Sequence, residues 1–420
     1  MSFLREKLRP SASPLHQIVT HAYYRNPFYR TKFSSAGIGP DQIQRAEELG
    51  LLPFTAREEL EADPWILLAV PKDQLVQVHL STGTSGRHPL YIFFTWEDLH
   101  VRGLMPLVAE APAARLLRIE EGEVVFNALP YEVSVTGLAI HRALQDGIGA
   151  CVVPVGKGGF YADPEKTLKL MYALRGDHLF TTPSYALYLA ELAAGAGIAN
   201  PAEIGLRSLW LVGELCSQAL RRRLEGLWQC PAFLYYGSLE AGPIGLECSM
   251  RDGFHLASNF VQVEIVPCTD VDPGVGEIVV TVLWRHAAPL LRFRTGDLGR
   301  WDPSSCRCGL PGPRLRILGR REDLIAAPER PRFALELDEV LLSLSGVSPW
   351  YRLEPEAGGL RVLLPAVPDG DRESVVESVQ ANLDRRFGLA SVVEFRGDLG
   401  YSGGKLVRVI RHGTEGGHDR

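Results

Sequence analysis

Short apolar runs alternate with helix-forming stretches in the middle of the chain, and this alternation constrains the fold more than any other feature. The runs lie at 124–126, 150–153, 179–181, 208–212 and 233–236. Two of the intervening helices begin at a cap followed by proline, Asp163-Pro164 and Thr182-Pro183, a pair that suits the first turn of a helix. Strands that alternate with helices form a mostly parallel sheet covered on both faces. We therefore expect an α/β fold.

The pattern changes twice further along the chain. From about Asn259 it becomes β-rich, because the runs 261–266 and 277–284 flank a turn-forming segment as in an antiparallel pair. The rest contains two more apolar runs and a helix from about Glu373 to Phe387 that Gly388 ends. We predict a large N-terminal domain over 1–319, with a β-rich subdomain at about 259–318, and a small α+β C-terminal domain over 320–420.

Composition excludes several classes of protein. An apolar fraction of 46% and a charged fraction of 22% are those of a globular chain. The net charge of −6 provides no basic surface for nucleic acid. No run of about 18 apolar residues is available to span a membrane, and the N-terminus is charged where a secretory signal is apolar. We expect a cytoplasmic protein that binds neither nucleic acid nor a membrane.

A loop rich in hydroxyls and glycine follows the apolar run 75–80. Its members are Ser81, Thr82, Gly83, Thr84, Ser85 and Gly86. The glycines let backbone N–H groups approach an anion closely, while the hydroxyls donate around it. Taken alone, such a cluster is also typical of a solvated turn. Its composition is nonetheless what a polyphosphate requires.

Three further elements follow this loop in a fixed order. They are Tyr235-Tyr-Gly-Ser-Leu-Glu240, Arg292-Phe-Arg-Thr-Gly-Asp297, and Gly319-Arg320 followed by Lys405. The ordered set resembles the adenylate-forming superfamily, and within it the phenylacetate-CoA ligase and coenzyme F390 synthetase-like family. The segments 26–30, 52–55 and 403–408 resemble further motifs of that family, so the resemblance covers nearly the whole chain. It implies ATP-dependent activation of a small aryl or related carboxylic acid as an acyl-adenylate, release of pyrophosphate, and transfer to the thiol of CoA.

The resemblance also implies a role for each motif. The loop 81–86 would hold the β- and γ-phosphates, Tyr236 would stack on adenine, and Asp297 would accept from the ribose hydroxyls. Glu240 is the expected magnesium ligand, because a hard carboxylate suits a hard ion. The other expected nucleotide contacts are Gly213, Glu214, Gly237, Ser238 and Arg320. The same residue types, taken alone, are typical of strand ends and turns.

Lys405 matches the catalytic lysine of the family, which bridges carboxylate and α-phosphate oxygens in the transition state. Because it lies in the small domain, that domain must close over the nucleotide for the lysine to act. Glu322 lies where the superfamily has its hinge residue. The resemblance therefore implies that the small domain is mobile.

Three thiols and one imidazole form a separate candidate site, for a metal. Cys248, His255, Cys306 and Cys308 suit tetrahedral Zn²⁺, and part of the family carries a similar set. Four protein ligands would make the site structural rather than catalytic. The remaining cysteines, expected to be core or surface thiols, are Cys151, Cys216, Cys230 and Cys268.

The segment 127–141 corresponds to the acid-binding segment of the family. Tyr131, Val133 and His141 are the candidate pocket walls, although a histidine on an apolar helix is as typical of a core. An ionised Glu132 would repel a carboxylate unless it meets an amine or faces solvent. The segment therefore does not specify phenylacetate as the acid.

One departure from the family leaves the acceptor open. After the hinge, relatives have a glycine-containing loop against the pantetheine of the acceptor, whereas this chain has two prolines within 325–334. The acceptor could instead be a carrier-protein phosphopantetheine or an amine. A third interpretation is a nucleotide-binding scaffold without turnover, against which Glu240, Asp297 and Lys405 argue. Relatives are often dimers, so a homodimer is a candidate assembly.

Overall fold

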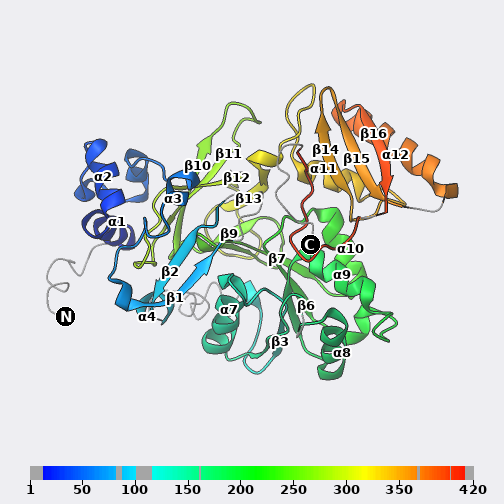
Figure 1. The fold of residues 1–420 in the computed structure, drawn as a ribbon, viewed down its shortest axis with the longest axis horizontal. Coiled ribbons are helices and arrows are strands. Elements are labelled where there is room, and N and C mark those ends of the chain that lie inside the picture. The colour runs from blue at the N-terminus through cyan, green and yellow to red at the C-terminus, as the bar shows by residue number, and fades with distance from the viewer. Residues whose placement is uncertain are drawn as a thin grey trace.

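Two parts of unequal size make up the structure, a computed structural model that describes residues 13–81, 88–100, 116–159, 162–366, 369–397 and 399–411. The larger part carries a long mixed sheet, and the smaller C-terminal part packs against its helices (Figure 1). Among the described residues, none of the helices has the length and apolar character needed to cross a membrane.

One sheet organises the larger part. Within the described residues its eleven strands lie in the order β10 (Val261–Pro267), β11 (Gly276–Val282), β12 (Phe293–Asp302), β13 (Arg314–Arg320), β9 (Phe254–Leu256), β8 (Gly242–Glu247), β7 (Ala232–Ser238), β6 (Ser208–Val212), β5 (His178–Thr181), β3 (Val124–Asn127) and β4 (Cys151–Val153). Neighbours from β7 to β4 run parallel, and neighbours from β10 to β7 run antiparallel.

The parallel half is buried on both faces, which confirms the predicted α/β fold. On β6, Leu209 and Leu211 join one hydrophobic core and Trp210 joins the other, because successive side chains of a strand point to opposite faces. The first core is closed by α8 (Pro164–Leu174), α9 (Pro183–Leu192) and α10 (Gln218–Trp228). The second includes α7 (Val135–Arg142). The predicted caps are present, since Asp163 accepts from Lys166 N and Thr182 accepts from Tyr185 N.

The segment predicted as a β-rich subdomain continues this same sheet. Strand β11 is buried along its whole length between β10 and β12. The hairpin of β12 and β13 pairs Asp297 with Arg320, so two of the predicted nucleotide residues become neighbours through strand register alone.

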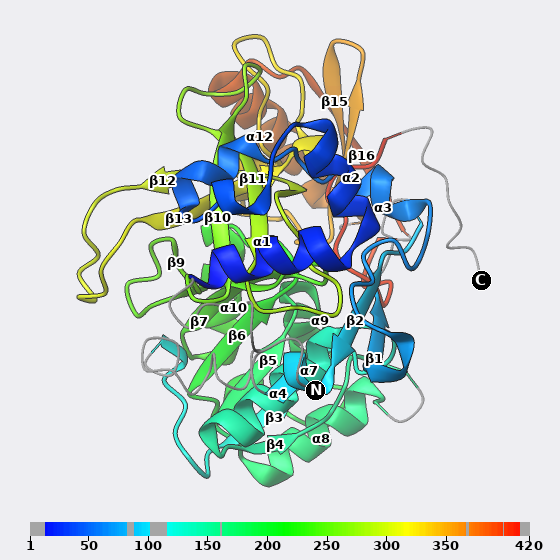
Figure 2. The same cartoon turned by 90° about the vertical axis from the view of Figure 1, so that its left-hand side faces the viewer.

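The N-terminal segment packs on the antiparallel half through α1 (Pro14–Arg25), α2 (Pro27–Ser35) and α3 (Arg57–Glu61). Figure 2 shows α1 lying across β10 and β11. The buried Asn26 joins the first two helices, because its side-chain oxygen accepts from Tyr29 N at 3.0 Å and its nitrogen donates to Ile66 O at 2.8 Å. A hairpin of β1 (Leu75–Leu80) and β2 (Tyr91–Thr95), followed by α4 (Trp96–His100), flanks the glycine and hydroxyl loop.

The smaller part has its own sheet and its own core. It contains α11 (Ala334–Leu341), β14 (Arg352–Glu356), β15 (Gly359–Pro365), α12 (Asp369–Phe387) and β16 (Ser391–Arg396). Gly388 follows α12 with φ +63°, the left-handed conformation that commonly ends a helix. After β16 the chain returns toward α9 (Figure 1), where Tyr401 stacks on Tyr188 with ring centroids 4.3 Å apart.

Candidate functional site

The predicted nucleotide residues come from neighbouring strand ends. Gly213 and Glu214 follow β6, and Tyr236, Gly237 and Ser238 end β7, its parallel neighbour. In open α/β sheets ligands bind outside the carboxyl ends of such strands. Gly213 has φ +82°, and among the described residues no atom lies within 4 Å of where its Cβ would be. The backbone is therefore open to a ligand at this point.

Asp297 lies between an aromatic and a basic side chain. The Tyr236 hydroxyl donates to Asp297 Oδ2 at 2.7 Å, and Arg320 Nε donates to Oδ1 at 3.3 Å. Burial raises the pKa of Asp297, while Arg320 and the tyrosine hydroxyl oppose that rise. Burial and the adjacent Asp297 raise the pKa of Tyr236. The three side chains thus form one hydrogen-bonded group that connects β7, β12 and β13.

Only the first residue of the predicted phosphate loop lies within the described part of the chain. Ser81 Oγ accepts from Leu90 N at 2.8 Å and from Arg57 Nη2 at 3.2 Å, which fixes the start of the loop. The remaining predicted members lie outside the described residues: Thr82, Gly83, Thr84, Ser85 and Gly86.

Glu240, the predicted magnesium ligand, lies in the turn between β7 and β8. Its carboxylate accepts from Arg57 Nη1 at 3.0 Å, and its side chain is 13% exposed. Ser238 Oγ accepts from Ala241 N at 3.0 Å and closes the same turn. A Cβ on Gly237 would lie 2.6 Å from Gly242 O, so this position has no room for a side chain. Arg57 therefore links the phosphate loop to the predicted metal ligand.

Lys405 reaches the same region from the smaller part. The residue as a whole is exposed along the C-terminal segment, while nearby protein atoms partly desolvate its ammonium group. Burial, and then Arg320, lower the pKa of Lys405, while Glu214, Glu240 and Asp297 oppose that change. The charges of carboxylates from three separate segments thus act on the ammonium group of Lys405.

Two residues of the site were missed in the sequence. Arg57 follows the 52–55 motif by two residues, which was the available signal. Lys157 lies among Gly156, Gly158 and Gly159 and forms an ion pair with Glu214 at 3.7 Å. Glu214 itself caps α9, because its carboxylate accepts from Ser184 N at 3.0 Å.

The predicted hinge residue lies directly after β13. Glu322 accepts from Arg320 Nη1 at 3.0 Å. Arg320 therefore contacts both the predicted hinge residue and Asp297, a predicted nucleotide contact. Burial, with Glu322 beside it, raises the pKa of Asp323 to about 6.

Two of the three predicted pocket residues contact each other. Tyr131 Oη lies 3.0 Å from His141 Nδ1, and burial raises the pKa of Tyr131. The carbonyl of Val133 accepts from Leu80 N at 3.1 Å, which ties this segment to the strand before the phosphate loop. The Val133 side chain is 57% exposed, and Glu132 is exposed to solvent. A charge at Glu132 therefore faces water rather than an enclosed pocket.

The predicted metal ligands converge. The ligand atoms of Cys248, His255, Cys306 and Cys308 all lie within 4.8 Å of one another. Two of the separations are 3.6 Å, between the sulfurs of Cys248 and Cys306, and 3.3 Å, between Cys308 Sγ and His255 Nε2. Zinc bonds of about 2.3 Å to sulfur in a tetrahedron separate the ligands by about 3.8 Å. The donor set and spacing fit Zn²⁺ without rearrangement of the backbone.

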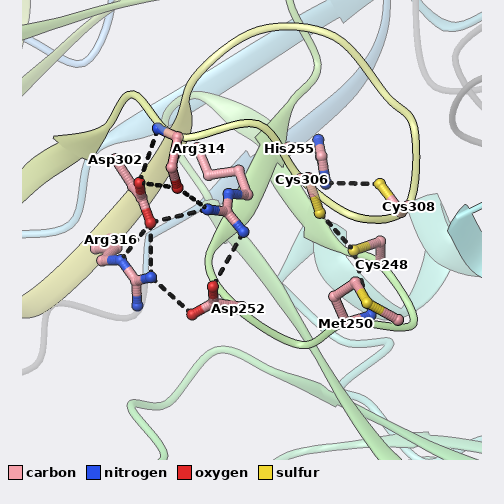
Figure 3. A network of polar contacts seen from close by, with 10 residues as sticks. Cys248, Met250, Asp252, His255, Asp302, Cys306, Cys308, Arg314 and Arg316 are labelled. Atoms are coloured by element: carbon pink, nitrogen blue, oxygen red, sulfur yellow. Dashed lines mark hydrogen bonds and ion pairs between the residues drawn. The ribbon is translucent and has the colours of Figure 1, made fainter.

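This cluster joins two hairpins (Figure 3). Cys248 and His255 belong to the β8–β9 hairpin, whereas the other two cysteines lie in the loop between β12 and β13. Beside it, Arg314 donates to Asp252 at 3.1 Å and to Asp302 at 2.9 Å. Hydrogen bonds from Ser304 and Arg316 keep the pKa of Asp302 well below its usual range. The cluster therefore lies at the junction of the β8–β9 hairpin and the β12–β13 loop.

Comparison with known proteins identifies relatives of the chain. No family model matches it. The phenylacetate-CoA ligase of Thermus thermophilus is 34% identical over 362 residues, which cover 83% of this chain and 78% of that protein. The phenylacetate-CoA ligase of Pseudomonas putida is 28% identical over 410 residues, covering 93% and 90%.

Solved structures show the same fold. A 2-hydroxyisobutyryl-CoA ligase in the postadenylation state, in complex with 2-HIB-AMP, has a TM-score of 0.85 at 21% identity over 95% of this chain and 88% of that one. In its thioesterification state, with 2-HIB-AMP and CoA, the same ligase gives 0.67 at 22% identity over the same shares. The fold, the order of the motifs and the identity to the Thermus protein agree, and the chain belongs to the phenylacetate-CoA ligase family of adenylate-forming enzymes.

Proposed function

We propose that this ligase converts a small carboxylic acid to its CoA thioester in two steps. In the first, a carboxylate oxygen attacks the α-phosphorus of ATP, the bond to the β-phosphate breaks, and pyrophosphate leaves. In the second, the CoA sulfur attacks the acyl carbon, AMP leaves, and the thiol proton passes to solvent. The observation that carries the proposal is the contact of the turn before Lys405 with the site, because Lys157 donates to Gly404 O at 3.2 Å and pairs with Glu214 at 3.7 Å.

The nucleotide would lie along the ends of β6 and β7. Tyr236 offers a ring to adenine, and Asp297 offers oxygens to the ribose. The hydrogen bonds from Tyr236 and Arg320 to Asp297 support this role, because they hold the carboxylate in one orientation. The remaining proposed contacts are Gly213, Glu214, Gly237 and Ser238.

The triphosphate would lie on the loop 81–86. Arg57 supports this placement, since it contacts both Ser81 and Glu240 and brings positive charge to the loop. Glu240 would hold Mg²⁺, a fit supported by its hard carboxylate and by the arginine, Arg57, that it shares with Ser81. The bound metal would neutralise charge on the phosphates and the leaving pyrophosphate.

Lys405 would stabilise the negative charge that develops on the α-phosphate oxygens. We place the boundary between the domains at 319–320 and the hinge at Glu322, so that the residues from 320 to 420 rotate before thioester formation. The higher similarity to the postadenylation state than to the thioesterification state supports an adenylation arrangement here.

The acid would lie against the 127–141 segment. Tyr131, Val133 and His141 are the proposed walls, supported by the link from Val133 to the strand that precedes the phosphate loop. An aryl acid or a related small acid suits an aromatic wall next to an exposed aliphatic side chain.

Zn²⁺ at Cys248, His255, Cys306 and Cys308 would have four protein ligands and therefore no open position for chemistry. It would hold the β12–β13 loop against the β8–β9 hairpin. We propose a structural role for this metal.

The segment after the hinge favours a second candidate for the acceptor of the acyl group, a carrier protein or an amine in place of CoA. Ile325 and Arg332 form an antiparallel bridge, with Ile325 N donating to Arg332 O at 2.9 Å. Arg330 is held by Glu336 at 2.6 Å. This closed hairpin replaces the glycine-containing loop of relatives, which favours a test of acceptors other than CoA.

The test is ATP–pyrophosphate exchange over a panel of aryl and short aliphatic acids. CoA-dependent formation of AMP and acyl-CoA is then measured for each acid that supports exchange. Lys405→Ala should abolish exchange, and Lys169→Ala, on the exposed side of α8, is the matched control. Exchange with no acid would favour a nucleotide-binding scaffold. Exchange without CoA-dependent AMP would favour a carrier protein or an amine as acceptor.

A further inference from the structure

A second lysine, Lys157, lies where the C-terminal segment meets the larger part. It belongs to the loop after β4, and its side chain is only 6% exposed. Its ammonium group lies 3.7 Å from Glu214 Oε1 and donates to the carbonyl of Gly404 at 3.2 Å. It therefore contacts the residue directly before Lys405.

The partners of Lys157 are themselves fixed. Glu214, 5% exposed, accepts from the backbone and hydroxyl of Ser184 at 3.0 and 2.7 Å. The flanking Gly156 and Gly158 have φ of +69° and +84°, a conformation that most side chains disfavour. A lysine held in this way on a rigid turn differs from a surface lysine that moves freely in water.

The contact from Lys157 to Gly404 joins the two parts of the molecule. Its ammonium group also lies 5.9 Å from the centre of the Tyr401 ring, which stacks on Tyr188. The Tyr401 hydroxyl in turn donates to Gly403 O at 3.2 Å. These contacts hold the turn that presents Lys405. Those made by Lys157 and Tyr188 cross between the two parts, so they depend on the present arrangement of the smaller part.

Keeping Lys157 here has an energetic cost. Burial lowers the pKa of Lys157, Glu214 opposes that change, and the charge of Lys405 adds to it. Two ammonium groups near one another repel, and a buried cation loses hydration that one carboxylate and one carbonyl replace only in part. Ordinary packing would be served as well by an apolar side chain.

We infer that Lys157 is a positioning residue for adenylation: it holds the 403–405 turn so that Lys405 faces the nucleotide site, and it releases that turn when the smaller part rotates for thioester formation. The inference rests on the proposed role of Lys405. Lys157 acts on a backbone carbonyl of the turn and needs no contact with a substrate. It should therefore matter for one half-reaction and not for the other.

The test compares Lys157→Met with the full-length wild-type protein in the two half-reactions. ATP–pyrophosphate exchange should fall about 10- to 100-fold, the cost of a catalytic group displaced by about 1 Å. Conversion of supplied acyl-adenylate and CoA to acyl-CoA should stay within about twofold of wild type, because Lys405 is not needed there. Lys157→Arg should restore part of the exchange, and Lys169→Met, which removes an exposed lysine from α8, should change neither half-reaction.

A readout without substrates separates this inference from the proposed function. Hydrogen exchange of the backbone amides in 399–411 should be faster in Lys157→Met than in wild type, with an unchanged melting temperature. Equal loss in both half-reactions, or no loss in either, would overturn the inference. Unchanged hydrogen exchange would overturn it too, whatever acid the enzyme uses. Wild-type protein without exchange activity would instead contradict the proposed function.

Discussion

Asp338 of α11 connects the smaller part to the larger one and also holds the smaller part together. Its carboxylate is 3% exposed and accepts from the Tyr351 hydroxyl at 2.6 Å and from Arg408 Nε at 2.9 Å, both within the smaller part. It also accepts from the hydroxyl of Ser217, the N-cap of α10 in the larger part. Asp338→Ala would remove all three interactions at once.

The expected loss of stability comes from the buried groups that lose their partner when Asp338 is replaced. Tyr351 is fully buried and the Arg408 side chain is 12% exposed, so neither gains full hydration in exchange. Removing one partner of a buried ion pair costs about 3–5 kcal/mol, and an unsatisfied buried hydroxyl costs about 1–3 kcal/mol. Because the two terms share one site and do not add fully, we expect about 4 kcal/mol. Ser217→Ala, which loses one hydrogen bond and one cap, should cost about 1–2 kcal/mol.

Hydrogen exchange measures the loss of stability separately for each part of the chain. A local measurement is needed because a protein with several cores need not unfold in a single two-state transition. Opening free energies for amides in α11 and β14 should fall by the larger amount in Asp338→Ala and by much less in Ser217→Ala. Amides of β5 and β6 in the larger part serve as the internal control and should not change. Equal effects of the two substitutions on α11 would refute the view that Asp338 organises the smaller part.

Three further outcomes follow from the site. Elemental analysis should find about one zinc per folded chain, and Cys306→Ser should lower the melting temperature; no metal with an unchanged melting temperature would contradict the zinc site. Arg57→Met should raise the KM for ATP by about tenfold, as loss of one charged contact of roughly 1.4 kcal/mol implies, measured by exchange against ATP concentration. Since burial and Arg320 lower the pKa of Lys405, exchange should decline as pH rises through that lowered pKa; activity sustained through the ordinary lysine range would contradict this.

Much of the fold and the enzyme class could be predicted from local patterns. The cap and proline pairs at Asp163 and Thr182 mark two helices correctly, because capping depends on residues only a few positions apart. The order of the motifs identified the family, and the comparisons confirm that assignment. Strand register was not predictable, although it is what pairs Asp297 with Arg320.

The contacts between distant segments had no local signal. Arg57 and Glu240 are separated by 183 positions, and Lys157 and Gly404 by 247. No periodicity or capping rule relates residues at such separations, because only the packed sheet brings them together. The convergence of the four metal-ligand candidates likewise joins residues as far apart as Cys248 and Cys308.

The interface between the two parts combines apolar packing, in which Trp350 joins a core of the larger part and Tyr401 packs against it, with hydrogen bonds between buried or half-buried groups. Ala219 N donates to Glu339, and Trp350 Nε1 donates to Glu191 at 2.8 Å. Water replaces such partners when they separate, so each hydrogen bond contributes only about 0.5–1.5 kcal/mol to closure. An apolar interface of similar size would hold the smaller part more tightly, because separation would expose its surface to water. The polar contacts therefore specify one orientation without making it permanent, which suits the rotation proposed above.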